Sequence, residues 1–248
     1  MTKEGKNSSA CAALQVGLAL LEGRATMGPD DPFEAARGAL ISAMSGNDTE
    51  CSPRAAFVLG MALFSRGDLT SARTCFAKAQ EFDHPDWSVG GLIGQAHLAA
   101  RECRSDDAAK LFRQVIDAGR TQFLGSAWYN LGTIHQQRGA VAEATEAYRR
   151  AMETKDAIFG PKAATNLGFV LANDLHDLQG ARQAFQVAIA SGDPQQAQIA
   201  AQNLRAMDEL DRARSAGKPL LSTEDDLDMS VPQGSGQVKR RWWLPWKA

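Results

Sequence analysis

A spacing of thirty-six residues recurs along this chain. Leu59-Gly60, Leu131-Gly132 and Leu167-Gly168 share one phase of that spacing, and Ala96 stands where a fourth Leu-Gly pair is missing. An aromatic residue follows each of these positions, at Phe76, Phe112, Tyr148 and, one residue late, Phe185. Repetition at such a period indicates stacked supersecondary units, each too small to bury its own apolar face. Such a chain is expected to present a binding surface, and the repeat weakens the case for an enzyme.

The best-defined unit spans about residues 125–155. Its apolar and small residues form two stripes at helical spacing, the first with Trp128, Leu131 and His135, the second with Ala144, Tyr148 and Ala151. Gly139 separates the stripes and predicts a tight turn between two antiparallel helices. We expect Gly132 and Ala144 to face each other where the two helices cross.

Trp-x-x-Leu-Gly followed by Ala-x-x-x-Tyr-x-x-Ala resembles the tetratricopeptide repeat signature of bacterial type, and the resemblance covers about residues 53–190. It implies an all-α fold, a right-handed α-solenoid of about five helix-turn-helix repeats. The residues that follow the repeats predict a C-terminal capping helix and a disordered tail. Two features depart from the family. The period is 36 where 34 is usual, and His135 stands where the family has Tyr.

The predicted organisation has three parts. Residues 1–8 are expected to be disordered, residues 9–215 to form the repeat domain, and residues 216–248 to form a disordered tail. The units are expected at about 9–47, 53–82, 88–118, 125–155 and 161–191, with a cap at 195–214. Trp87, Phe123 and Phe159 recur at the same period and are interpreted as staples for the loops between units. Asp31, Ser52 and Asp193 each precede a proline and predict helix starts, and Glu34 is placed to reach back to the first of these.

Composition sets limits on function. The formal net charge is −2 and gives no pull towards nucleic acid. The four histidines, His84, His97, His135 and His176, are scattered, and neither a GxxxxGK loop nor an HExxH motif occurs. We therefore expect no catalytic residue, no metal, no cofactor and no enzyme activity.

The four cysteines contain no CxxC pair. They are expected to be reduced structural thiols of a cytosolic protein. The apolar stretch at residues 10–21 contains Gln15 and precedes Glu22, which favours an amphipathic helix over a signal peptide. No run of eighteen apolar residues predicts a membrane span. The predicted location is cytoplasmic, with the inner membrane face as the alternative.

The resemblance also implies a binding face, the concave side lined by the first helix of each unit. The family phase places partner-binding side chains at Phe57, Met61, His97, Arg101, Tyr129, Asn130, Thr133, Gln136, Lys162, Asn166 and Phe169. Several of them could equally contact only the neighbouring helix. A carboxylate clamp of the co-chaperone kind is disfavoured, because Asn130, Lys162 and Asn166 match its residues only in part. The mixture of aromatic, amide and basic groups suits an extended or helical peptide.

The C-terminal end concentrates three of the five tryptophans in its last ten residues. The tail motif comprises Arg240, Arg241, Trp242, Trp243 and Trp246. It could touch a membrane interface weakly, be captured by a partner as a linear motif, or fold back on its own groove. The primary prediction is a non-catalytic scaffold for a protein or peptide partner. The alternative is a peripheral membrane adaptor anchored through this tail.

Overall fold

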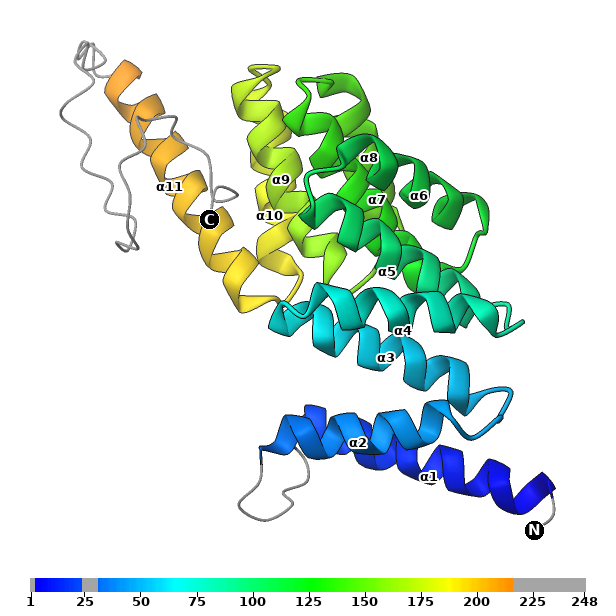
Figure 1. Ribbon diagram of the computed structural model, residues 1–248. Coiled ribbons are helices and arrows are strands. Elements are labelled where there is room, and N and C mark those ends of the chain that lie inside the picture. The colour runs from blue at the N-terminus through cyan, green and yellow to red at the C-terminus, as the bar shows by residue number, and fades with distance from the viewer. Residues whose placement is uncertain (1–2, 24–30, 216–248) are drawn as a thin grey trace. The chain divides into compact units, whose positions relative to one another are not determined.

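The protein is described here by a computed structural model that covers residues 3–23 and 31–215 (Figure 1). Every regular element within these residues is an α-helix, so the all-α prediction is confirmed. The helices are α1 (Lys3–Leu21), α2 (Pro32–Met44), α3 (Cys51–Arg66), α4 (Leu69–Glu81), α5 (Trp87–Arg101), α6 (Ser105–Asp117), α7 (Thr121–Gln137), α8 (Val141–Glu153), α9 (Phe159–Asn173), α10 (Leu178–Ala190) and α11 (Pro194–Ser215).

The chain divides into two compact units, Met1–Asp156 and Ala157–Ala248, where the sequence predicts one repeat domain over residues 9–215. The period of a repeat reports how neighbouring helices pair and does not fix how many pairs form one body. Helix α1 begins at Lys3, inside the segment predicted to be disordered. Residues 216–248, with the tail motif, lie outside the described residues.

The first unit contains α1 to α8 as four antiparallel pairs (Figure 1). Each helix packs on the next along the chain, and α3 also contacts α1 and α5, while α5 contacts α7. We call α1, α3, α5 and α7 the first helices and α2, α4, α6 and α8 the second helices. A core of alanine, leucine and phenylalanine runs between the two sets.

The repeated Leu-Gly glycines make room for the repeated aromatics. A Cβ atom added at Gly60 would lie 2.6 Å from the Phe76 ring, and one added at Gly132 would lie 2.8 Å from the Tyr148 ring. Tyr148 and Phe76 are both fully buried. The nearest neighbours of the Cβ position at Gly132 are Tyr148 and Ala147, and the expected facing of Gly132 and Ala144 stays a prediction. The ring of Tyr148 fills the crossing, because it needs the space that a side chain at this glycine would take.

Helix starts in the first unit show one confirmed cap and two corrections. The Asp31 carboxylate accepts from Phe33 N at 2.9 Å, with Pro32 in the first turn, as predicted. Glu34 does not reach back to this cap, and its carboxylate lies 3.4 Å from Arg37 instead. Ser52 does not cap α3, which already begins at Cys51, one residue earlier.

The second unit contains the pair α9 and α10 followed by α11. A Cβ atom at Gly168 would lie 2.5 Å from the Phe185 ring, so the glycine–aromatic rule recurs here. Asp193 accepts from Gln196 N at 2.9 Å and starts α11, as predicted. Arg182 of α10 forms ion pairs with two carboxylates of α11, Asp208 and Asp211. The last helix therefore packs on α10, with Ala200 and Met207 buried and these ion pairs beside them.

Candidate protein-interaction surface

A stripe on α3 carries two of the predicted binding residues. Arg54, Phe57, Met61 and Phe64 follow spacings of three, four and three, which place them on one side of a helix. All four side chains are half-buried. The facing residues of α5 are Trp87, His97 and Arg101. We call these seven residues the α3–α5 seam.

One end of the seam is an aromatic cluster. The ring centroid of Phe57 lies 5.7 Å from that of Trp87 and 5.6 Å from that of Phe123, an arrangement in the range of favourable aromatic pairs. Gly90 permits this approach, since a Cβ there would lie 3.2 Å from both Phe57 and Phe123. Trp87 and Phe123 thus join first helices to one another. Both residues lie in helical first turns, so their interpretation as staples for loops is corrected.

The two arginines of the seam are held by rings. The guanidinium carbon of Arg54 lies 5.7 Å from the Trp87 ring centroid, and that of Arg101 lies 5.3 Å from the Phe64 ring centroid. Such cation–π contacts leave the N–H edge of the guanidinium open to carboxylates. Arg54 was not among the predicted binding residues, although its spacing of three from Phe57 was a usable signal.

His97 links α5 to α7. Its Nε2 lies 3.3 Å from both Ser126 Oγ and Asn130 Nδ2, so this nitrogen accepts and the proton resides on Nδ1. Nδ1 is buried without a hydrogen-bond partner among the described residues. Burial lowers the pKa of His97 to about 4, so the ring is neutral near pH 7. His97 therefore packs between α5 and α7, and its part in binding stays a prediction.

The α7 residues of the predicted face are engaged with their own unit. The Tyr148 hydroxyl donates to Gln136 Oε1 at 2.7 Å, and the Thr133 hydroxyl donates to the Tyr129 carbonyl at 3.1 Å. The side-chain amide of Asn130 donates to the Ser126 carbonyl at 2.8 Å. These contacts fix the rotamers of a half-buried polar strip.

The second unit carries the other three predicted residues on α9. The ammonium of Lys162 lies 5.5 Å from the Phe159 ring centroid, and Lys162 and Asn166 are half-buried. Phe169 is only 4% exposed and packs edge-on against Phe185 at 5.4 Å. Phe169 therefore belongs to the core of this unit and offers little surface to a partner.

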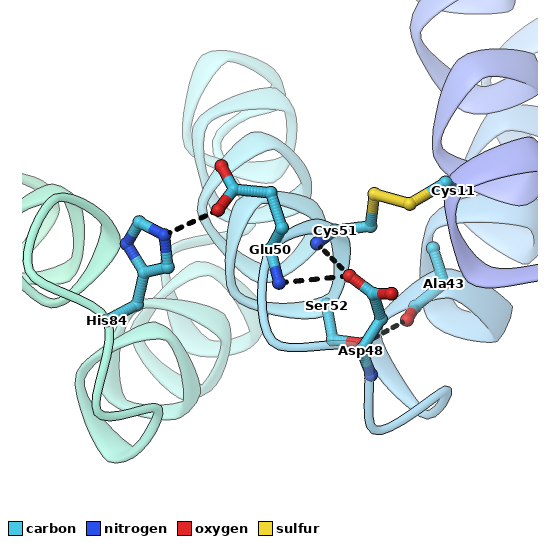
Figure 2. Close-up of a disulfide and its surroundings, with 7 residues drawn as sticks. All are labelled: Cys11, Ala43, Asp48, Glu50, Cys51, Ser52 and His84. Atoms are coloured by element: carbon cyan, nitrogen blue, oxygen red, sulfur yellow. Dashed lines mark hydrogen bonds and ion pairs between the residues drawn. A yellow bond between two sulfur atoms is a disulfide. The ribbon is translucent and has the colours of Figure 1, made fainter. Parts of the chain in front are cut away.

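A disulfide ties the first helix of the chain to α3. Cys11 of α1 and Cys51 at the start of α3 are bonded, with their Cα atoms 5.2 Å apart, as Figure 2 shows. The expectation that all four cysteines are reduced is wrong for this pair. Spacing along the sequence could not reveal it, because the 40-residue separation becomes short only when α1 packs on α3. Cys75 and Cys103 are free, one buried and one exposed.

Asp48 organises the residues beside the disulfide. Its carboxylate accepts from Cys51 N at 2.6 Å and from Glu50 N at 2.9 Å, so Asp48 satisfies the N–H group of the first residue of α3 (Figure 2). The Ser52 hydroxyl instead donates to the Ala43 carbonyl at 2.8 Å and joins α3 to the end of α2. The pair Ser52-Pro53 was a weak signal, because Asp48, four residues earlier, can also accept from the N–H groups at the start of α3.

Among the described residues, the side chains of Cys11, Asp48 and Cys51 bring together sulfur and carboxylate atoms of the kinds that bind metal ions. Sulfurs joined in a disulfide are not thiolate ligands, and the Asp48 carboxylate already accepts two backbone N–H groups. These residues therefore form a structural junction. Within the described ranges, no helix is both long enough and apolar enough to cross a bilayer.

Comparison with known proteins supports the reading of the helices. A family model for the tetratricopeptide repeat matches residues 93–157. A Sel1 repeat protein from Oxalobacter formigenes superposes with a TM-score of 0.53 at 19% identity, covering 75% of this chain and 75% of that one. MamA from Desulfovibrio magneticus RS-1 superposes with a TM-score of 0.51 at 19% identity, covering 75% of this chain and 97% of that one. No curated protein matches the chain by sequence.

Structural likeness at this identity defines a fold, that of an all-α protein built from repeated helix pairs. The family match adds the kind of repeat. Residues 93–157 thus match the tetratricopeptide repeat, and the described helices share the fold of known helical repeat proteins.

Proposed function

We propose that this protein is a non-catalytic scaffold that binds a peptide or protein partner on its first helices. The observation that carries the proposal is the α3–α5 seam with the neighbouring α7 strip. There, half-buried apolar, aromatic and amide side chains are fixed by contacts within the fold, and Arg101 is exposed above them. Rigid aromatic and arginine side chains are the groups that contribute most at protein interfaces. In the second unit, Lys162 and Asn166 are proposed to serve the same role.

A pull-down with purified full-length protein tests the proposal. The variant Tyr129→Ala with Lys162→Ala removes two proposed contacts, and Lys110→Ala with Arg149→Ala is the matched control on the second helices. Captured proteins that disappear with the first variant and persist with the control support the proposal. The best candidate should then be purified and its affinity for both variants measured. Equal binding by both variants would reject the first-helix face.

The alternative function, a peripheral membrane adaptor, depends on residues 239–248. Co-sedimentation with vesicles of mixed neutral and anionic lipid, for the chain with and without these residues, separates the two. Binding that is lost on truncation and at high salt supports the adaptor. Binding to a protein partner that survives truncation supports the scaffold.

A further inference from the structure

Three of the first helices, α3, α5 and α7, differ from the second helices in charge. Within α3, α5 and α7 there is no aspartate or glutamate, and the basic residues are Arg54, Arg66 and Arg101. The second helices α4, α6 and α8 carry carboxylates together with basic residues. Their carboxylates are Glu81, Asp106, Asp107, Asp117, Glu143, Glu146 and Glu153. Arginines on these three helices can therefore pair only with carboxylates from other parts of the chain.

The carboxylates that flank α3 and α5 are engaged elsewhere. Glu50, before α3, lies 2.9 Å from His84 Nε2. Asp86, before α5, lies 3.4 Å from Arg120. Glu102, after α5, pairs with Arg73 and with Arg104. The nearest acidic groups in sequence are thus committed to pairs that do not involve the seam.

Arg54 and Arg101 therefore differ from most arginines of this unit. Among the described residues, their recorded contacts are the rings of Trp87 and Phe64, with no carboxylate. By contrast, Arg66 pairs with Asp31 at 3.5 Å. Between the two arginines lie the half-buried apolar side chains of Phe57 and Met61. The seam thus has, at each end, one arginine without a recorded carboxylate partner, and half-buried apolar side chains between the two.

We propose that the α3–α5 seam binds an acidic peptide segment of a partner protein, with one carboxylate on Arg54, another on Arg101, and apolar side chains over Phe57 and Met61. This inference rests on the proposed scaffold function and names the chemistry of its partner. Arg54 and Phe64, over which Arg101 lies, are ten positions apart, so the two guanidinium groups are separated by about 15 Å along α3. An extended peptide covers that length in about four to five residues.

Fluorescence anisotropy with the full chain tests the proposal. The probe is a labelled peptide with two acidic clusters four to five residues apart and leucine and phenylalanine between them. Its control has asparagine and glutamine in place of the acids. We expect the acidic probe to bind at least about tenfold more tightly than the amide probe, and added salt to remove most of that difference. Equal binding of the two probes would overturn the proposal.

Two variants locate the contact. Arg54→Gln with Arg101→Gln should weaken binding of the acidic probe by about tenfold or more, whereas Lys110→Gln with Arg149→Gln removes the same charge from the second helices and should change it by less than about twofold. The reversed variant, Arg54→Glu with Arg101→Glu, should prefer a lysine version of the probe, a gain that misfolding cannot produce. Equal losses from both glutamine variants, or no gain from reversal, would contradict the proposal.

The outcomes also separate this inference from the scaffold function. Partners that depend on Tyr129 and Lys162 in the pull-down, together with no binding of the acidic probe, would leave the scaffold standing and reject the acidic ligand. If no partner depends on Tyr129 and Lys162 and the acidic probe does not bind, both the scaffold function and the acidic ligand are rejected.

Discussion

The first and second helices of the first unit share one period but carry different chemistry. The first helices place glycines, aromatic rings and ring-held arginines against each other, as at Gly90, Phe57 and Arg54. The second helices turn a charged side to solvent, where Arg150 pairs with Glu146 and Glu153. The comparison teaches that the repeat fixes the fold through buried contacts, while the charge of each exposed side is free to differ. Substitutions on the two sets should therefore have effects of very different size.

The largest loss should come from the buried aromatic between the two sets. Phe76 is fully buried, and the backbones of Gly60 and Gly94 approach its ring. Phe76→Ala should lower the free energy of unfolding by about 3–5 kcal/mol, because the cavity left between two helix pairs cannot close. Urea unfolding followed by circular dichroism measures it. A change below about 1 kcal/mol would show that this crossing does not hold the pairs together.

The disulfide gives the next effect, since it joins two first helices. Cys51→Ser should lower the free energy of unfolding by about 2–4 kcal/mol, as expected when a crosslink across some tens of residues is lost. Dithiothreitol should bring the wild type to the same value and leave the variant unchanged. Cys103→Ser, at an exposed free cysteine, is the control and should have no effect. Insensitivity of the wild type to dithiothreitol would show that Cys11 and Cys51 are not bonded in solution.

The buried imidazole of His97, on the first helix α5, should make the stability of the fold depend on pH. Its pKa is about 4 in the folded chain and about 6.5 when unfolded, so between these values the unfolded state binds more protons. Stability should therefore fall as the pH drops from 7 to 5, by about 2 kcal/mol from this residue alone. Burial also lowers the pKa of His135, but that effect is the same in the wild type and in a variant changed only at His97.

The variant His97→Gln isolates that contribution, because glutamine does not titrate. Unfolding curves at pH 7 and pH 5 should show a steeper loss for the wild type than for the variant. Parallel losses would mean that His97 is accessible to water and protonates normally in the folded protein.

The smallest effect belongs to the second helices. Lys78 and Glu81 of α4 form an exposed ion pair at 2.8 Å, one helical turn apart. Glu81→Ala should cost no more than about 0.5 kcal/mol, because such pairs gain little in water. Thermal unfolding at low and high salt should give nearly the same difference from wild type. A loss as large as that of Phe76→Ala would erase the distinction between the two sets.

The sequence predicted the helix pairs because their cause is local. The Leu-Gly phase and the aromatic that follows are both needed at one crossing, and both recur at a fixed spacing, so the repeated positions were visible in the sequence, although Gly132 was matched with Ala144 and not with Tyr148. The Asp31 cap was equally visible, since the capping residue and its N–H donor are two residues apart. Features set by neighbouring residues are the ones a single sequence reveals.

Features set by packing were not predictable. Cys11 and Cys51 meet only because α1 lies on α3, and four cysteines allow several pairings. Phe169 shares the phase of exposed residues but turns into the core against Phe185. The importance of Arg54 depends on where the neighbouring carboxylates go, and Glu50 and Asp86 find partners distant from it in sequence. The predicted partner-binding set remains a prediction.

The central claim is that ligand binds the first helices and leaves the second helices free. Photo-crosslinking with the acidic probe, carrying a photoreactive group between its acidic clusters, followed by peptide mapping, tests this most directly. The account predicts covalent attachment within residues 51–66 and 87–101, suppressed by excess unlabelled probe. Attachment concentrated in residues 69–81 and 105–117 would contradict it.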